Sequence, residues 1–117
     1  MIVDDAREKY EGIVEEFKLR QIEVEFISPK DIKIQDIAKV NFLILSMVEA
    51  GNFQGKPLLT KGEKVLRCME SAQCRIPTLI ISANKNILQS NYGFVYSQMK
   101  DCKDKGKVLS VIKKAVI

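Results

Sequence analysis

The sequence predicts an α/β fold in which five parallel strands form one doubly wound sheet with helices on both faces. Apolar residues alternate between the spacing of strands and the spacing of helices from one end of the chain to the other. Residues 42–47 and 77–83 are apolar runs between polar loops, which is typical of central parallel strands. With 117 residues, 46% of them hydrophobic, the chain can bury one core, so we expect one domain over residues 1–117.

The N-terminal residues predict a strand followed by an amphipathic helix. Residues 2–3 form the short strand, and four apolar residues then recur at helical spacing: Tyr10, Ile13, Val14 and Phe17. Asp5 and Glu8 have the spacing of a capping box, which satisfies backbone N–H groups at the start of a helix. We therefore expect the first helix to begin just after the first strand.

A second strand and a second helix are predicted next. Residues 22–27 alternate apolar and polar side chains, as a strand near a sheet edge does. Ser28 and Pro29 supply an N-cap residue and a first-turn proline, so we expect a short helix that ends near Val40.

The centre of the chain predicts a third helix between the two apolar runs. Thr60 and Glu63 have capping-box spacing, and apolar residues follow at i, i+3, i+4 and i+7: Val65, Cys68, Met69 and Ala72.

The C-terminal part predicts a shortened fourth helix, a fifth strand and a last helix. Residues 84–91 leave room for barely two helical turns, residues 93–97 form the strand, and residues 108–116 carry the apolar face of the last helix. Right-handed crossovers between five such units most simply give the flavodoxin-like strand order 2-1-3-4-5.

Composition excludes several classes of protein. The chain has no histidine, which excludes His-dependent triads, and its three cysteines include no C-x-x-C pair, so zinc sites and disulfide frameworks are poorly supported. No apolar run approaches the ~18 residues of a membrane span, and no signal segment precedes Asp4. We therefore expect a cytoplasmic protein with free thiols and no membrane partner.

Charge is distributed unevenly around a net value of +4. Residues 1–25 hold eight acids and four bases, whereas residues 100–117 hold six lysines and two aspartates. The lysine-rich end has no arginine and no aromatic residue for base stacking. We therefore expect a solvated helix face there and no nucleic-acid partner.

Polar residues follow several of the predicted strands. In a doubly wound sheet, ligands bind at the carboxyl ends of the strands, where Asp4, Asp5, Ser46, Ser82 and Ser97 are expected. Two adjacent carboxylates beside a hydroxyl could hold Mg²⁺, which prefers oxygen ligands. The alternative is structural, with Asp5 capping the first helix and Asp4 solvated.

Three segments resemble receiver (CheY-like) domains of two-component systems. Residues 1–5 are similar to the acidic pair that ends their first strand, and residues 42–55 resemble their acceptor strand and the loop after it. Residues 76–83, an Ile-Pro pair followed by apolar residues and Ser-Ala, resemble their fourth strand most specifically. In receivers the acidic pair binds Mg²⁺, an aspartate on strand three is phosphorylated, a Ser or Thr on strand four bonds to the phosphoryl group, and a lysine on strand five neutralises it. The resemblance implies these roles in outline for Asp4, Asp5 and Ser82.

Two positions depart from that family pattern. Ser46 stands where the acceptor aspartate belongs, and a serine hydroxyl cannot form the acyl phosphate. Ser97 falls at the place expected for the lysine, and Phe94 at the place of the switch aromatic, although a strand aromatic is more often part of the core. We therefore expect a degenerate receiver, not an enzyme, that signals by protein–protein interaction and binds Mg²⁺ weakly if at all.

Two alternatives remain open from the sequence. One is an active phosphorelay receiver with another acceptor, for which Glu49 is the nearest acid, and the other is a flavodoxin-like enzyme with Ser46 as nucleophile. The enzyme alternative lacks a histidine base and any G-x-G-x-x-G or P-loop motif. For the degenerate receiver, we expect strand five and the last helix to bind a kinase, an effector or a second copy of the chain.

Overall fold

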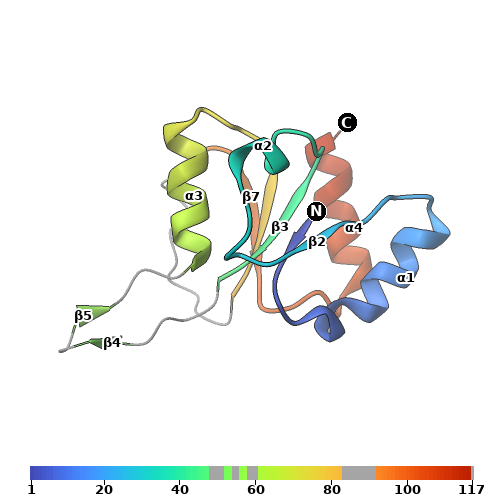
Figure 1. The fold of residues 1–117 in the computed structure, drawn as a ribbon. Helices are drawn as coiled ribbons and strands as arrows, with labels where there is room; N and C mark the ends of the chain where they lie inside the picture. The colour runs from blue at the N-terminus through green and yellow to red at the C-terminus, as the bar shows by residue number, and fades with distance from the viewer. Residues whose placement is uncertain (48–51, 54–55, 58–60, 83–91, 117) are drawn as a thin grey trace.

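Five parallel strands form a central sheet in the computed structural model, and helices lie on both of its faces (Figure 1). The order across the sheet is β2-β1-β3-β6-β7, so the α/β doubly wound class and the predicted order 2-1-3-4-5 are confirmed. These strands are β1 (Ile2–Val3), β2 (Phe26–Ile27), β3 (Leu43–Ser46), β6 (Thr78–Ile81) and β7 (Val95–Met99). The structure describes residues 1–47, 52–53, 56–57, 61–82 and 92–116.

The parallel register aligns the carboxyl ends of the central strands. Val3 of β1 pairs with Leu45 of β3, and Ser46 of β3 pairs with Ile81 of β6. Ile81 pairs in turn with Met99 of β7. The residues that end or follow these strands therefore lie along one edge of the sheet, which is where the fold class places ligand sites.

Apolar helix faces cover the sheet in two layers. The helices are α1 (Glu11–Leu19), which the 3₁₀ turn η1 (Arg7–Tyr10) precedes, α2 (Ile34–Ile37), α3 (Lys61–Ser71) and α4 (Lys105–Val116). Ile13 of α1 and Val108 of α4 are buried in the same apolar cluster as Ile44 of β3. Leu66 of α3 is buried in a second cluster with Leu45, the next residue of β3. Because successive residues of a strand point to opposite faces, these two clusters lie on the two sides of the sheet.

The second strand and the second helix are shorter than predicted. Only Phe26–Ile27 forms β2, because its neighbour β1 offers two residues for pairing. The Ser28 Oγ accepts the Lys30 N–H at 3.3 Å, but this turn does not continue as a helix. Instead α2 starts after Lys33, and it contains a single turn.

The first helix also begins differently from its prediction. No side-chain cap is present at η1 or at α1, so the predicted capping box of Asp5 and Glu8 does not form. Both α1 and α3 are followed by a glutamine in the left-handed region, Gln21 with φ 58° and Gln73 with φ 55°. This conformation ends each helix in the way that a glycine usually does.

The chain between β3 and α3 contains a small hairpin. Strands β4 (Asn52–Phe53) and β5 (Lys56–Pro57) pair antiparallel in a two-stranded sheet of their own. The third helix is confirmed as Lys61–Ser71, while its predicted cap residue Thr60 lies outside the described residues. The predicted fourth helix at 84–91 also lies outside them.

The fifth strand starts two residues later than predicted. The Val95 N–H donates to the Tyr92 carbonyl at 3.1 Å, so a turn occupies the residues where the strand was expected to begin. The last helix is confirmed, and it begins at Lys105. Within the described part of the chain, none of the helices is both long and apolar enough to cross a membrane.

Candidate functional site

The carboxyl edge of the sheet gathers four polar residues from four strands. Asp4 directly follows β1, Ser46 ends β3, Ser82 follows β6 and Lys100 follows β7. The first three are buried, whereas Lys100 is exposed. The Ser82 N–H donates to the Met99 carbonyl at 2.9 Å, which fixes the ends of β6 and β7 side by side. Three of the predicted site residues therefore lie at the same edge.

The Asp4 carboxylate is occupied by hydrogen bonds from its own chain. One oxygen, Oδ1, accepts the Ala6 N–H at 3.0 Å, and the other, Oδ2, accepts the Tyr10 hydroxyl at 2.7 Å. Only 4% of Asp4 is exposed, and Tyr10 is exposed by 1%. A buried carboxylate requires such partners, because an unpaired charge away from water is costly. The two oxygens of Asp4 thus hold the two ends of η1.

Tyr10 connects Asp4 to Ser46. Burial raises the pKa of Tyr10 above its usual range, and the hydrogen bond to Asp4 and the negative charge of Asp4 add to this rise. A side-chain hydrogen bond with Ser46 opposes part of it, since a hydroxyl donor stabilises the phenolate. The Tyr10 ring packs against Phe26 with centroids 6.1 Å apart. The phenol therefore stays protonated and remains a hydrogen-bond donor to Asp4.

A buried thiol lies near this tyrosine. Cys102 is 4% exposed, and burial followed by the negative charge of Asp101 raises the pKa of the Cys102 thiol to about 12. A protonated thiol is neither a nucleophile nor a metal ligand at neutral pH. Cys102 is thus a packing residue behind the edge.

Helix α3 begins directly against the end of β3. A Cβ on Gly62 would meet the sulfur of Met47 and would lie 2.9 Å from the Ser46 carbonyl oxygen. Real side chains essentially never approach backbone so closely, so only glycine permits this contact. The helix therefore packs tightly beside Ser46.

The predicted metal ligands do not converge. Asp5 is exposed, while Asp4 is buried with both oxygens already bonded. Over the described ranges, no group of three or more Cys, Asp or Glu side chains is placed to hold a metal ion. The alternative, in which Asp5 caps the first helix and Asp4 is solvated, is also wrong. The carboxylate that bonds to the backbone at the helix start is that of Asp4, and Asp4 is buried.

The predicted lysine position requires a correction. Thr78 pairs with Val95 but Leu79 pairs with Ser97, so one extra residue, Tyr96, bulges from β7. With this bulge and the later strand start, Ser97 lies inside the strand and not at its end. Lys100 is the residue that follows the strand.

The predicted switch aromatic also lies elsewhere. Phe94 precedes β7 at the amino end of the sheet, where its carbonyl accepts the Thr78 N–H at 2.9 Å. Phe94 is 3% exposed, and its ring lies 5.6 Å from that of Tyr92. It is therefore a core residue far along the strand from Ser46. Glu49, the alternative acceptor, lies outside the described residues.

Two residues of the edge were not singled out by the sequence. Tyr10 was expected only as part of an apolar helix face, although a buried tyrosine hydroxyl usually needs a partner and Asp4 lies six residues before it in the chain. Lys100 was missed because the bulge hides the end of β7 from a periodicity argument. No periodic signal in residues 95–99 marks this strand end, because Val95 and Ser97 pair with the adjacent residues Thr78 and Leu79.

Comparison with models of known protein families finds no match to this chain, and comparison with curated proteins finds none either.

Proposed function

We propose that this chain is a degenerate receiver domain that acts in signal transduction by binding a protein partner, without aspartyl phosphorylation. Its strand order is that of the family, and Asp4, Ser46 and Ser82 lie at the edge where a receiver holds its reacting groups. Lys100 adds to the resemblance, since it follows the fifth strand of the sheet, where the family has its lysine.

The observation that carries this proposal is the Tyr10–Asp4 hydrogen bond beside Ser46. In a receiver the acidic pair must be open to Mg²⁺ and the acceptor must be a carboxylate. Here the acceptor position holds a hydroxyl, and the buried Asp4 carboxylate accepts a hydrogen bond from the Tyr10 hydroxyl at 2.7 Å. The edge thus stabilises the fold through an internal network, and no catalytic role is proposed for it.

The surface proposed for the partner is formed by β7 and α4. Strand β7 is the last strand of the sheet, and Tyr96 on its bulge is 54% exposed. Lys103 after β7 and Lys107 in the first turn of α4 are exposed, and their charge would increase the association rate with an acidic partner. The partner is a kinase, an effector or a second copy of the chain.

The free thiols at the described cysteines support a cytoplasmic location.

Incubation with a small phosphodonor tests whether the chain acts without aspartyl phosphorylation. The chain is treated with phosphoramidate and Mg²⁺, and its intact mass is measured before and after. We expect no change in mass, with an active receiver labelled in parallel as the positive control. A stoichiometric gain of one phosphate that hydroxylamine removes would show that the chain is an active receiver with another acceptor.

Charge reversal tests the partner surface. Lys103→Glu with Lys107→Glu should weaken self-association in sedimentation velocity, or capture of a partner from an extract of the source organism, and should leave thermal stability unchanged. Lys39→Glu, which changes an exposed lysine on the chain between α2 and β3, is the matched control. If association survives the double reversal but is lost when Asp4 or Ser46 is changed, the interface lies at the carboxyl edge instead.

A further inference from the structure

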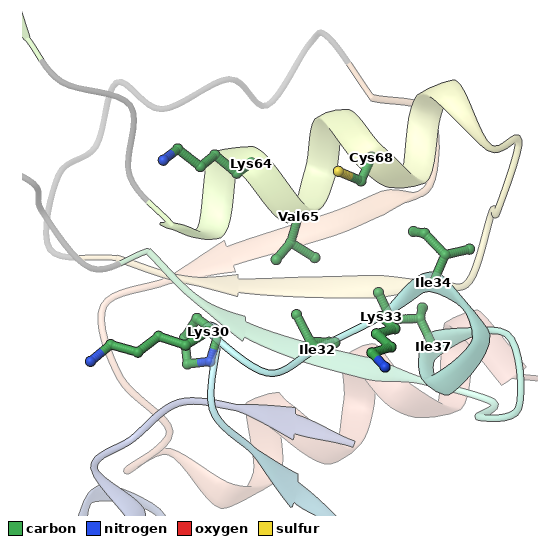
Figure 2. A pocket seen from close by; sticks show the side chains of 9 residues that line it. Lys30, Ile32, Lys33, Ile34, Ile37, Lys64, Val65 and Cys68 are labelled. Atoms are coloured by element: carbon green, nitrogen blue, oxygen red, sulfur yellow. The ribbon is translucent and has the colours of Figure 1, made fainter.

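A groove of about 530 Å³ (Figure 2) lies on the face of the sheet covered by α2 and α3, opposite the face against which Tyr10 packs. It separates α3 from the segment 29–37. Helix α2 is only one turn long, so most of this segment crosses the sheet without packing a helical face against α3. Small-molecule sites typically have volumes of roughly 300–1,000 Å³, and this groove falls within that range.

The floor of the groove is apolar. Ile37 and Val65 are buried, and Ile32 and Ile34 are half-buried with part of each side chain accessible from the groove. Figure 2 shows Val65 pointing from α3 toward the isoleucines of the opposite segment. Burying the accessible part of these side chains under an alkyl chain would be favourable, at roughly 25 cal/mol per Å² of apolar surface.

The rim of the groove is positively charged. The lining includes Lys30, Lys33 and Lys64, all of them exposed, and none of the lining residues that the structure describes is acidic. None of these three lysines forms an ion pair with another residue that the structure describes. In Figure 2 the amino groups of Lys30 and Lys64 extend toward the same end of the groove, whereas Cys68 lies toward the other end.

We propose that this groove binds a small amphiphilic anion, with an alkyl chain on the isoleucine floor and a terminal carboxylate between Lys30 and Lys64. The charge of the rim selects an anion, and the apolar floor selects a hydrocarbon chain. The site is separate from the proposed receiver function and does not depend on it.

The length of the groove favours a small ligand over an amphipathic helix of a partner. Of the residues that the structure describes, α3 contributes Lys64, Val65 and Cys68, and they span about 6 Å along the helix axis. A helix in a groove is held by anchors up to seven residues apart, or about 10 Å. A medium-chain carboxylate needs no such length on α3, because its chain can lie across the segment 29–37.

Titration with sodium decanoate, below the concentration at which it forms micelles, tests the proposal. Binding is followed by calorimetry, and the alkylation rate of Cys68 by iodoacetamide is followed by peptide mass analysis. We expect a Kd of about a few millimolar, which is what a ligand efficiency near 0.3 kcal/mol per non-hydrogen atom gives for decanoate, and slower alkylation of Cys68. Cys74 is a free thiol outside the lining, so its alkylation rate should not change.

Two comparisons establish whether both parts of the ligand are recognised. Decanol has the same chain without the charge and should bind about tenfold more weakly, while acetate has the charge without the chain and should not bind. Lys30→Glu with Lys64→Glu should weaken decanoate binding by about tenfold, as expected for two reversed surface charges. Lys18→Glu with Lys39→Glu, two exposed lysines outside the lining, should leave it unchanged, and circular dichroism confirms that each variant is folded.

Several results would overturn the proposal. These are no binding of decanoate, equal binding of decanol, or equal decanoate binding by the Lys30 and Lys64 variant. Protection of Cys68 by an acidic amphipathic peptide when decanoate gives none would show that the groove is a protein interface instead.

Discussion

Removing the Tyr10 hydroxyl should destabilise the chain by about 1.5–3 kcal/mol, the range for a hydrogen bond to a charged group. Tyr10→Phe keeps the buried ring, which packs on Phe26, and removes only the donor that lies 2.7 Å from Asp4 Oδ2. Asp4 is 4% exposed, so water cannot easily replace the lost donor. For a chain of 117 residues, this corresponds to a fall in Tm of about 6–12 °C.

Urea unfolding followed by circular dichroism measures this effect, and an unchanged slope with urea would confirm that only stability has changed. Tyr96→Phe is the matched control, since it removes the same hydroxyl from a side chain that is 54% exposed, and it should change stability by less than about 0.5 kcal/mol. Combining Tyr10→Phe with Asp4→Asn gives the coupling energy between the two residues. A loss for Tyr10→Phe no larger than that for Tyr96→Phe would refute the assigned role of this bond.

Three further predictions concern packing, pH and metal. Gly62→Ala should destabilise the chain by about 1–3 kcal/mol, although alanine favours helices, because its methyl group would collide with the end of β3. Gly93→Ala is the control, since its methyl group would meet no atom within 4 Å and the change should be nearly neutral. Urea unfolding measures both variants. Burial raises the pKa of the Cys102 thiol to about 12, so the folded chain holds this proton more tightly than the unfolded chain does. The resulting stabilisation is complete below about pH 9, and the free energy of unfolding should fall as the pH rises from 9 toward 12; Cys102→Ala should reduce this fall and Cys68→Ala should not. Mg²⁺ should bind with a Kd in the millimolar range or weaker, which is a binding free energy of about 4 kcal/mol at most, because Asp4 is already hydrogen-bonded and Asp5 is exposed. A micromolar Kd measured by calorimetry would contradict this.

The sequence predicted the sheet because its central strands carry an unambiguous signal. Runs such as 42–47 are apolar on both faces, and few structures other than a covered parallel strand place such a run between polar loops. The edge elements were predicted less well. Residues 22–27 alternate like a strand, but the length of β2 depends on how much of β1 is available for pairing. Ser28 bonds locally as predicted, yet a local turn does not determine whether a helix follows.

The candidate site was predicted in position but not in chemistry. Asp4, Ser46 and Ser82 were placed correctly at the carboxyl edge, because each follows or ends an apolar strand. The partner of Asp4 was not predicted, since the Tyr10 hydroxyl reaches it through the 3₁₀ turn η1, where the sequence predicted the start of an α-helix. Lys100 was missed for a similar reason, because the bulge at β7 alters the spacing on which the prediction depended.

Restoring the acceptor carboxylate tests most directly whether this edge is a receiver site that has lost its chemistry. The variant with Ser46→Asp and Tyr10→Phe supplies the missing acid and releases Asp4, while Lys100 and Ser82 remain in place. We predict that phosphoramidate and Mg²⁺ add one hydroxylamine-labile phosphate to this variant, that a further Lys100→Ala lowers the yield, and that the unchanged chain gains none. A folded variant that takes up no phosphate, or an unchanged chain that takes up one, would contradict the proposal.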